Sequence, residues 1–258
     1  MQILWLKEVL DRLQVQRGDV ILFSSDIKKL AWNCMKRKEK LDLNDLLDTV
    51  IEAIGEKGTL LVPTYNWDFC KGVPFDYLHS PCMTGTLGTV ALKRSDFTRS
   101  LHPLYSCAIW GRDREMLCTR DYKDSFGKDS LFAYLHEKKA KNLALDVALH
   151  QFLTFTHYVE ESEGVPYRYV KDFSGEYIDG QGKSAHRTYS MYVRDLDLDV
   201  RTLIDPCEKD FLEQGAARQE VIYDSRFLLV ELAKAYEIMA DDIRNNNCRK
   251  LCAYIGQN

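Results

Sequence analysis

Short apolar segments alternate with amphipathic helical segments along much of this chain, and the alternation constrains the fold more than any other feature. The runs RGDVILFSS (17–25), KGTLLVPTY (57–65) and NLALDVAL (142–149) have the length and composition of buried strands. Residues 4–13 and 43–55 instead carry apolar side chains at the helical period. Helices that alternate with buried strands predict an α/β fold, in which a mixed sheet is flanked by helices.

The rest of the chain predicts further elements of both kinds. In order, we expect an aperiodic aromatic loop at 66–83, a glycine-containing turn and helix at 84–94, a strand at 106–111, helices at 129–139 and 150–163, an antiparallel hairpin from 165–173 and 186–195, and a helix at 227–243. With 258 residues, one domain over 1–258 is favoured, within which the antiparallel carboxyl-terminal part from about residue 165 could form a smaller lobe.

Charge and composition exclude several classes of protein. Asp plus Glu number 39 against 35 Lys plus Arg, and the pI is near 5.9, which argues against a dedicated nucleic-acid binder. No run approaches the ~18 apolar residues of a membrane span, and residues 1–13 lack the apolar core of a secretion signal. We therefore expect a cytoplasmic protein with neither a nucleic-acid nor a membrane partner.

The eight cysteines are scattered and include no C-x-x-C pair, which predicts reduced, mostly buried thiols. Cys248 and Cys252 lie one helical turn apart, but they have no neighbouring histidine or second cysteine pair. We expect no metal site, because structural zinc is usually held by four such ligands.

The segment TFTHYVEES contains the most informative pattern. His157 and Glu160 are three residues apart and share one helical face, where a carboxylate can orient an imidazole. Histidine is well suited to take a proton near neutral pH, and Thr154 adds a hydroxyl one turn earlier. By itself the H-x-x-E pattern is common, and on the pattern alone a solvent-exposed His–Glu pair on an amphipathic helix is the favoured interpretation.

The segment RSLHPLYSCAIWG places His102 before Pro103 and leads into a strand with Ser106. A residue before proline is held extended, which suits a site at the edge of a strand and a structural turn equally well. Cys107 is close enough in sequence to suggest a Cys–His nucleophile, but an inert buried thiol is the simpler interpretation.

The segment TGTLGT offers glycines, hydroxyls and backbone amides at the start of a predicted helix. Gly85 and Gly88 permit close backbone approach, and helix amino termini hold phosphate groups. The segment matches neither the dinucleotide-binding glycine pattern nor a P-loop, so by itself it does not indicate a nucleotide. The chain also has no G-x-S-x-G and no H-E-x-x-H sequence.

Taken in order, these segments resemble the aminoglycoside 3-N-acetyltransferase family over about residues 18–170. The resemblance implies an α/β/α fold and transfer of an acetyl group from acetyl-CoA to an amino group, without a metal. The family's T-x-x-H-x-x-E falls on Thr154, His157 and Glu160, and implies that His157 and Glu160 are catalytic.

The other family motifs imply the binding residues. The S-x-H-P-x-x-S motif falls on Ser100, His102, Pro103 and Ser106. The resemblance assigns the CoA side to Ser24, Ser25, Gly85, Thr86 and Ser106, and the acceptor side to His102 and Thr154. The chain departs from the family at Phe23, where members often have His, and at Asp146, where they have Gly.

The acceptor and the mechanism are predicted from the same resemblance. The stretch HYVEESEGVPYRY (157–169) looks more like relatives that act on amino sugars of surface polysaccharides, so we favour an amino sugar, free or nucleotide-linked, over an aminoglycoside antibiotic. We expect direct transfer with His157 as general base, oriented by Glu160 or else by Asp205 or Glu208. The alternatives are an aminoglycoside 3-N-acetyltransferase, a related enzyme with another CoA thioester, and a non-catalytic protein that binds CoA or a carrier.

Overall fold

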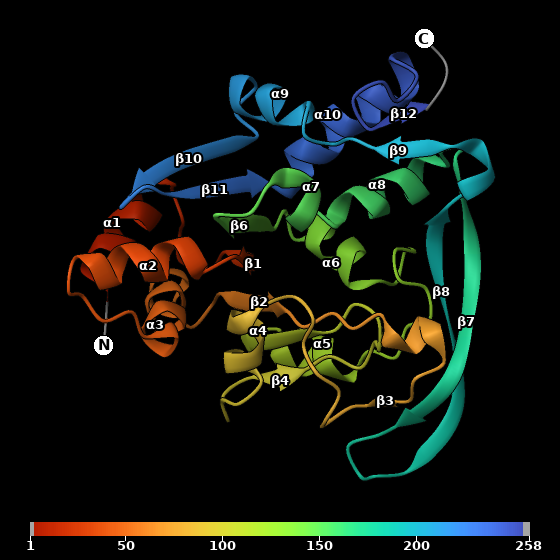
Figure 1. Ribbon diagram of the computed structural model, residues 1–258, viewed down its shortest axis with the longest axis horizontal. Coiled ribbons are helices and arrows are strands. Elements are labelled where there is room, and N and C mark those ends of the chain that lie inside the picture. Colours follow the sequence, from red (N-terminus) through yellow and green to blue (C-terminus); the bar gives the residue numbers. More distant parts are fainter. Residues whose placement is uncertain (1–2, 255–258) are drawn as a thin grey trace.

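A mixed seven-stranded sheet forms the centre of the protein, whose computed structural model describes residues 3–254 (Figure 1). Its strands are, in spatial order, β10 (Ala217–Ile222), β11 (Ser225–Glu231), β6 (Lys141–Leu145), β1 (Val20–Ser25), β2 (Thr59–Pro63), β5 (Cys107–Gly111) and β4 (Thr98–Arg99). β1 is parallel to both neighbours, β2 and β6, and the two edges are completed by antiparallel pairs. The predicted α/β fold with a mixed sheet is confirmed.

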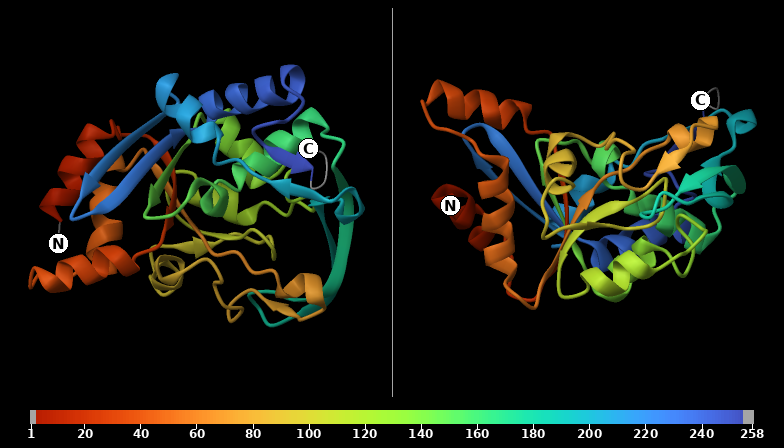
Figure 2. Two further views of the ribbon diagram at one scale, coloured as in Figure 1. Left: turned by 45° about the horizontal axis from the view of Figure 1, so that its top comes forward. Right: turned by 90° about the horizontal axis from the view of Figure 1, so that it is seen from below.

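Helices cover both faces of this sheet. They are α1 (Leu4–Arg12), α2 (Lys28–Lys36), α3 (Leu43–Ile54), α4 (Thr86–Ala91), α5 (Arg114–Thr119), α6 (Leu131–Glu137), α7 (Leu149–Phe152), α8 (Phe155–Glu163), α9 (Cys207–Glu213) and α10 (Leu232–Asn245). Figure 2 shows α1 and α3, in red and orange, on one side of the sheet and the green and blue helices on the other. No helix within 3–254 is long and apolar enough to cross a membrane.

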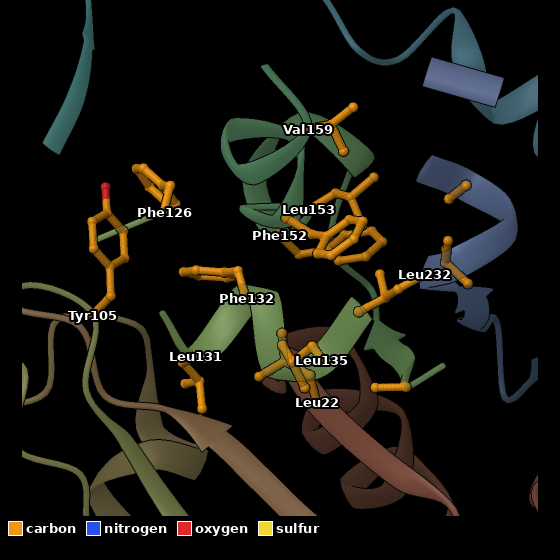
Figure 3. Close-up of a cluster of buried hydrophobic side chains, with 14 of the residues drawn as sticks. Leu22, Tyr105, Phe126, Leu131, Phe132, Leu135, Phe152, Leu153, Val159 and Leu232 are labelled. Atoms are coloured by element: carbon orange, nitrogen blue, oxygen red, sulfur yellow. The ribbon is translucent and has the colours of Figure 1, made fainter. Parts of the chain in front are cut away.

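Alternation along the strands divides the core into two layers. In β1, Ile21 and Phe23 pack with α1 and α3, whereas Leu22 faces the opposite cluster. Figure 3 shows this second cluster, in which Leu22 of β1 lies beside Leu135 of α6 and Val159 of α8 lies at the opposite side of the cluster. Because β1 is buried on both faces, its sequence is a continuous apolar run and does not alternate between apolar and polar residues.

A long antiparallel hairpin extends from the sheet at the right of Figure 1. It consists of β7 (Arg168–Ile178) and β8 (Ser184–Arg194), and β3 (Phe75–Asp76) pairs with β7. The predicted antiparallel section is therefore confirmed. The chain then passes through η2 (Leu196–Leu198) and β9 (Val200–Thr202), which pairs with β12 (Cys252–Tyr254). After α9, β10 and β11 return to the central sheet.

Three predicted elements are wrong in detail. The expected loop at 66–83 contains a 3-10 helix, η1 (Asp68–Lys71), and β3, since the hairpin gives β3 a pairing partner. The expected helix at 150–163 is interrupted between α7 and α8. The expected helix at 227–243 begins with strand residues of β11, because a short apolar run fits a buried strand and a buried helix equally well.

Candidate active site

The break between α7 and α8 lies just beyond the carboxyl end of β6. Ser24 and Ser25 end the neighbouring strand β1, so both segments reach the same edge of the parallel part of the sheet. Thr154 occupies the break, and its carbonyl accepts a hydrogen bond from the His157 amide at 3.0 Å. Ligands of open α/β sheets usually bind at this edge.

His157 and Glu160 form a hydrogen-bonded pair on α8. The distance from His157 Nδ1 to Glu160 Oε2 is 2.8 Å, and Nδ1 must donate because an ionised carboxylate only accepts. The His157 side chain is 28% exposed, whereas that of Glu160 is 0% exposed. Phe126 packs edge-on against the imidazole, with ring centroids 5.3 Å apart. This leaves Nε2 as the ring nitrogen that can take up a proton.

Two residues that follow α8 hold the other sides of the Glu160 carboxylate. Arg168 Nε lies 2.7 Å from Oε2, and the Tyr167 hydroxyl donates to Oε1 at 3.0 Å. Burial by itself would raise the pKa of Glu160. The hydrogen bond from His157 and the positive charges of His157 and Arg168 outweigh it and lower that pKa below its usual value. Glu160 is therefore an ionised carboxylate inside the protein.

The two other acids considered from the sequence bind elsewhere. Asp205 accepts from both the amide and Nδ1 of His150, at 2.9 and 2.6 Å. Glu208 pairs with Arg226 at 2.8 Å. Among the three acids, Glu160 is the one in contact with His157.

Three cavities with shared lining residues lie around Thr154 and His157. The serine cavity, of about 250 Å³, is lined by Ser24, Ser25, Pro63, Tyr65, Trp67, Met83, Thr84, Val147, Gln151, Phe152 and Thr154. It shares Trp67, Gln151 and Thr154 with a connecting cavity of about 190 Å³, which reaches His157. His157 also lines the hairpin cavity, of about 600 Å³, together with residues of β7, β8 and the segment after β8. His157 thus lies in a wall that the connecting cavity and the hairpin cavity share.

The structure brings several residues predicted for the CoA side to the serine cavity. Ser24 and Ser25 line it directly. Gly85 lies beside them, since a Cβ built on it would be 3.4 Å from the Ser25 carbonyl oxygen. Thr86 begins α4 and is exposed, but it does not line the cavity.

Two predicted binding residues lie in the core instead. Ser106 is fully buried, where it donates to the Thr64 carbonyl and accepts from Arg99 Nε, both at 3.0 Å. His102 is 1% exposed and stacks on Tyr122, with its ring centroid 4.9 Å away. Burial lowers the pKa of His102 to about 3, so its ring is neutral. Neither residue lines any of the three cavities, so ligand binding by them stays a prediction without geometric support.

The remaining sequence features also have a structural explanation. Burial raises the pKa of the fully buried Cys107 thiol far above its usual value, so this side chain fits the inert thiol and not a nucleophile. Asp146, where the family has glycine, adopts φ 50°, a left-handed conformation that Asp tolerates better than most residues. Phe23 replaces a polar residue of the family and is buried in the core.

Tyr167, Arg168, Trp67 and Gln151 are site residues that the sequence analysis missed. A usable signal exists for the first two: Gly164 ends α8 with φ 67°, so the chain reverses there and the next residues pass back along the helix. A Tyr–Arg pair in that position can reach a carboxylate on the last turns of the helix. Trp67 comes from the aromatic segment 66–83, and such irregular segments often carry function.

A histidine hydrogen-bonded to a buried carboxylate, in a wall shared by two cavities, is an arrangement that suits proton transfer between bound molecules. A profile of the aminoglycoside 3-N-acetyltransferase family matches residues 22–243, and the chain belongs to this family. It is accordingly an acyltransferase, an acetyl-CoA-dependent N-acetyltransferase. A comparison with curated proteins finds no matching sequence.

Solved structures share the fold at low sequence identity. Sisomicin-bound AAC-VIa has a TM-score of 0.80 and 19% identity, covering 95% of this chain and 98% of its own. AAC-IIIb, solved as a binary complex with CoASH, has a TM-score of 0.79 and 19% identity, covering 95% and 97%. The aminoglycoside acetyltransferase AAC(3)-Xa has a TM-score of 0.76 and 20% identity, covering 90% and 88%. Within residues 3–254, no cluster of three or more His, Cys, Asp or Glu side chains could hold a metal ion.

Proposed function

We propose that this enzyme acetylates a primary amine of an amino sugar, with His157 as general base and Glu160 as its orienting carboxylate. The observation that carries the proposal is the contact between His157 Nδ1 and the fully buried Glu160, with His157 lining two cavities. A buried acceptor on Nδ1 fixes the ring and leaves Nε2 available for a proton.

The serine cavity fits the donor. Ser24, Ser25 and Thr84 supply hydroxyls, while Tyr65, Val147 and Phe152 supply apolar contacts. A pantetheine arm has alternating amide and methylene groups and needs both kinds of contact. In this arrangement the thioester approaches Thr154, and the arm comes from the side of Ser24 and Ser25.

The reaction is a direct transfer. The amine nitrogen attacks the thioester carbonyl and gives a proton to His157 Nε2. The new C–N bond forms, the C–S bond breaks, and CoA leaves as the thiolate, which takes up a proton. A positioned base contributes about 10²–10⁴-fold to such a step.

The first acceptor class to test is the aminoglycosides. This differs from our preference from the sequence, because the family and structures such as sisomicin-bound AAC-VIa support an aminoglycoside acceptor better than a nucleotide-linked sugar. Asp195 and Asp197 line the hairpin cavity and could receive the ammonium groups of a polycation.

An anionic amino sugar, such as a nucleotide-linked one, remains a second candidate because of two cations in the same cavity. Lys171 and Arg194 line the hairpin cavity, and neither forms an ion pair with another residue of 3–254. Unpaired cations beside the acceptor position favour a phosphate or carboxylate on the acceptor. They do not favour an aminoglycoside, which would bring further positive charge.

The experiment is a thiol-release assay with acetyl-CoA and three groups of amines: aminoglycosides, free amino sugars and nucleoside-diphosphate-linked amino sugars. We expect amine-dependent release with one group, and a 10²–10⁴-fold loss of kcat in His157→Ala with little change in the affinity for acetyl-CoA. Binding of acetyl-CoA without amine-dependent release would support the non-catalytic alternative. Near-normal turnover by His157→Ala would remove His157 from the mechanism. Competition among CoA thioesters would identify the acyl donor.

A further inference from the structure

We infer that Arg168 is a positioning residue of this active site, whose guanidinium keeps the buried Glu160 carboxylate ionised and directed at His157. The inference rests on the proposed function insofar as His157 acts as a neutral base. Its geometric basis does not depend on the acceptor.

Arg168 is held rigidly against Glu160. It is the first residue of β7, and its side chain is 6% exposed. Its Nε lies 2.7 Å from Glu160 Oε2, the same oxygen that faces His157 Nδ1 at 2.8 Å. The other two nitrogens donate to the Tyr192 carbonyl of β8 and the Thr202 hydroxyl of β9, both at 3.3 Å, and these contacts hold the plane of the guanidinium.

The charge on Glu160 needs a permanent counter-ion. A carboxylate with no exposed surface is costly unless a cation or several hydrogen bonds compensate it. A general base must start the reaction as neutral imidazole, so at that stage His157 provides a hydrogen bond but no positive charge. Arg168 stays charged throughout, since a guanidinium does not lose its proton in proteins. Arg168 therefore supplies the compensating charge while His157 is free to accept a proton.

Other charged and titratable groups face His157 without touching Glu160. Among the residues of the connecting and hairpin cavities they are Tyr105, Tyr169, His150 with its partner Asp205, Lys171, Arg194, Asp195 and Asp197. Glu161 follows on α8 itself, and Tyr192, Cys248 and Cys252 interact electrostatically with Glu160 from other elements. The polar contacts of the Glu160 carboxylate within residues 3–254 come from His157, Tyr167 and Arg168. Of these three, Arg168 is the one with a permanent charge.

The test compares Arg168→Met and Arg168→Lys with a matched control, Arg244→Met. Arg244 of α10 pairs with Glu163, which lies on α8 as Glu160 does, and its Nε is 2.7 Å from Glu163 Oε2. Glu163 does not contact His157. Two quantities are measured: the pH profile of kcat/KM, and the titration of the Glu160 side-chain carboxyl carbon by NMR in the free protein.

In Arg168→Met we expect the Glu160 carboxylate to take up its proton at higher pH than in the wild type. The acid limb of the kcat/KM profile should move to higher pH in parallel, and kcat at neutral pH should fall about 10- to 100-fold, as for a displaced catalytic group. The Michaelis constant for acetyl-CoA should change little. Arg168→Lys should recover part of each effect, and Arg244→Met should show neither shift.

Unchanged titration of Glu160 and an unchanged acid limb in Arg168→Met would overturn the inference, even if that variant were less stable. If Arg168→Met does not fold, Arg168→Gln takes its place, because Gln keeps a hydrogen-bond donor but has no charge. The NMR titration requires no substrate. It therefore still decides the role of Arg168 if every amine fails and the proposed function is wrong.

Discussion

Replacing Glu160 with Gln should reveal how much the protein depends on its buried charges. The substitution keeps the shape of the side chain but removes the negative charge that Arg168 and His157 both face. Arg168, with a side chain 6% exposed, then becomes a cation without a counter-charge.

The structure sets the size of the effect. At a distance of 2.7 Å, the attraction in a medium of effective dielectric constant 20 is about 6 kcal/mol. Part of the loss is recovered as the guanidinium turns toward the hairpin cavity, so the cost should be about 3–5 kcal/mol, as for other broken buried ion pairs. For a chain of this length, that corresponds to a melting temperature lower by roughly 6–20 °C.

The double variant Glu160→Gln/Arg168→Met separates stability from catalysis. Because it removes both charges, its free energy of unfolding should be within about 2 kcal/mol of the wild type, and better than the sum of the single effects. Its kcat should stay low, since His157 has lost the carboxylate. Urea unfolding at pH 7 and the thiol-release assay measure the two quantities on the same four proteins. The reasoning would be refuted if the loss of unfolding free energy in the double variant equalled the sum of the two single losses, or if the double variant recovered kcat.

Three further predictions concern the serine cavity, the raised pKa of Glu161 and the backbone at Gly111. Ser25→Leu places a larger side chain in the serine cavity and should raise the Michaelis constant for acetyl-CoA about tenfold or more while changing that for the amine much less; equal changes for both substrates would contradict the assignment of this cavity to the donor. Burial, together with the neighbouring Asp124 carboxylate, raises the pKa of Glu161 to about 8, against 4.5 for an ordinary Glu. The unfolded chain then loses this proton at lower pH than the folded chain, so the folded state becomes less stable as the pH rises from about 4.5 to about 8. Glu161→Gln removes this effect and should therefore raise the melting temperature at pH 8 and much less at pH 5. Gly111, the last residue of β5, has φ 103°, and a Cβ there would clash with the Gly58 carbonyl oxygen, so Gly111→Ala should lower the free energy of unfolding in urea by at least about 1–3 kcal/mol; a variant as stable as the wild type would show that the backbone at this position relaxes freely.

The proposed binding of acetyl-CoA in the serine cavity is better tested by a substitution at Ser25 than by one at Gly85. Gly85 adopts φ 107°, a conformation that L residues rarely accept, so any side chain there introduces backbone strain regardless of the ligand. A loss of acetyl-CoA affinity in Gly85→Val could reflect that strain alone. Ser25 is free of this problem because it lies in an ordinary strand.

Local sequence patterns were sufficient to predict those elements and contacts that depend on residues close together in the sequence. The apolar run at 20–23 predicts β1 because a strand buried on both faces needs apolar residues without interruption. The three-residue spacing of His157 and Glu160 predicts their contact because one helical turn brings such positions together. The tyrosine-rich, β-branched segments after Gly164 predict the hairpin of β7 and β8 for a similar reason, since strand propensity and a glycine-containing turn act over a few residues.

Tertiary structure decided whatever depends on partners distant in sequence. The run at 227–230 has no periodicity that separates strand from helix, and its pairing with β6, more than 80 residues earlier, makes it a strand. His102 and Ser106 carry polar groups that suit a binding site, yet the packing of Tyr122, Thr64 and Arg99 around them encloses both in the core. Conversely, Glu160 on an amphipathic helix could face solvent. The chain reverses at Gly164, and Tyr167 and Arg168 then lie against the Glu160 carboxylate.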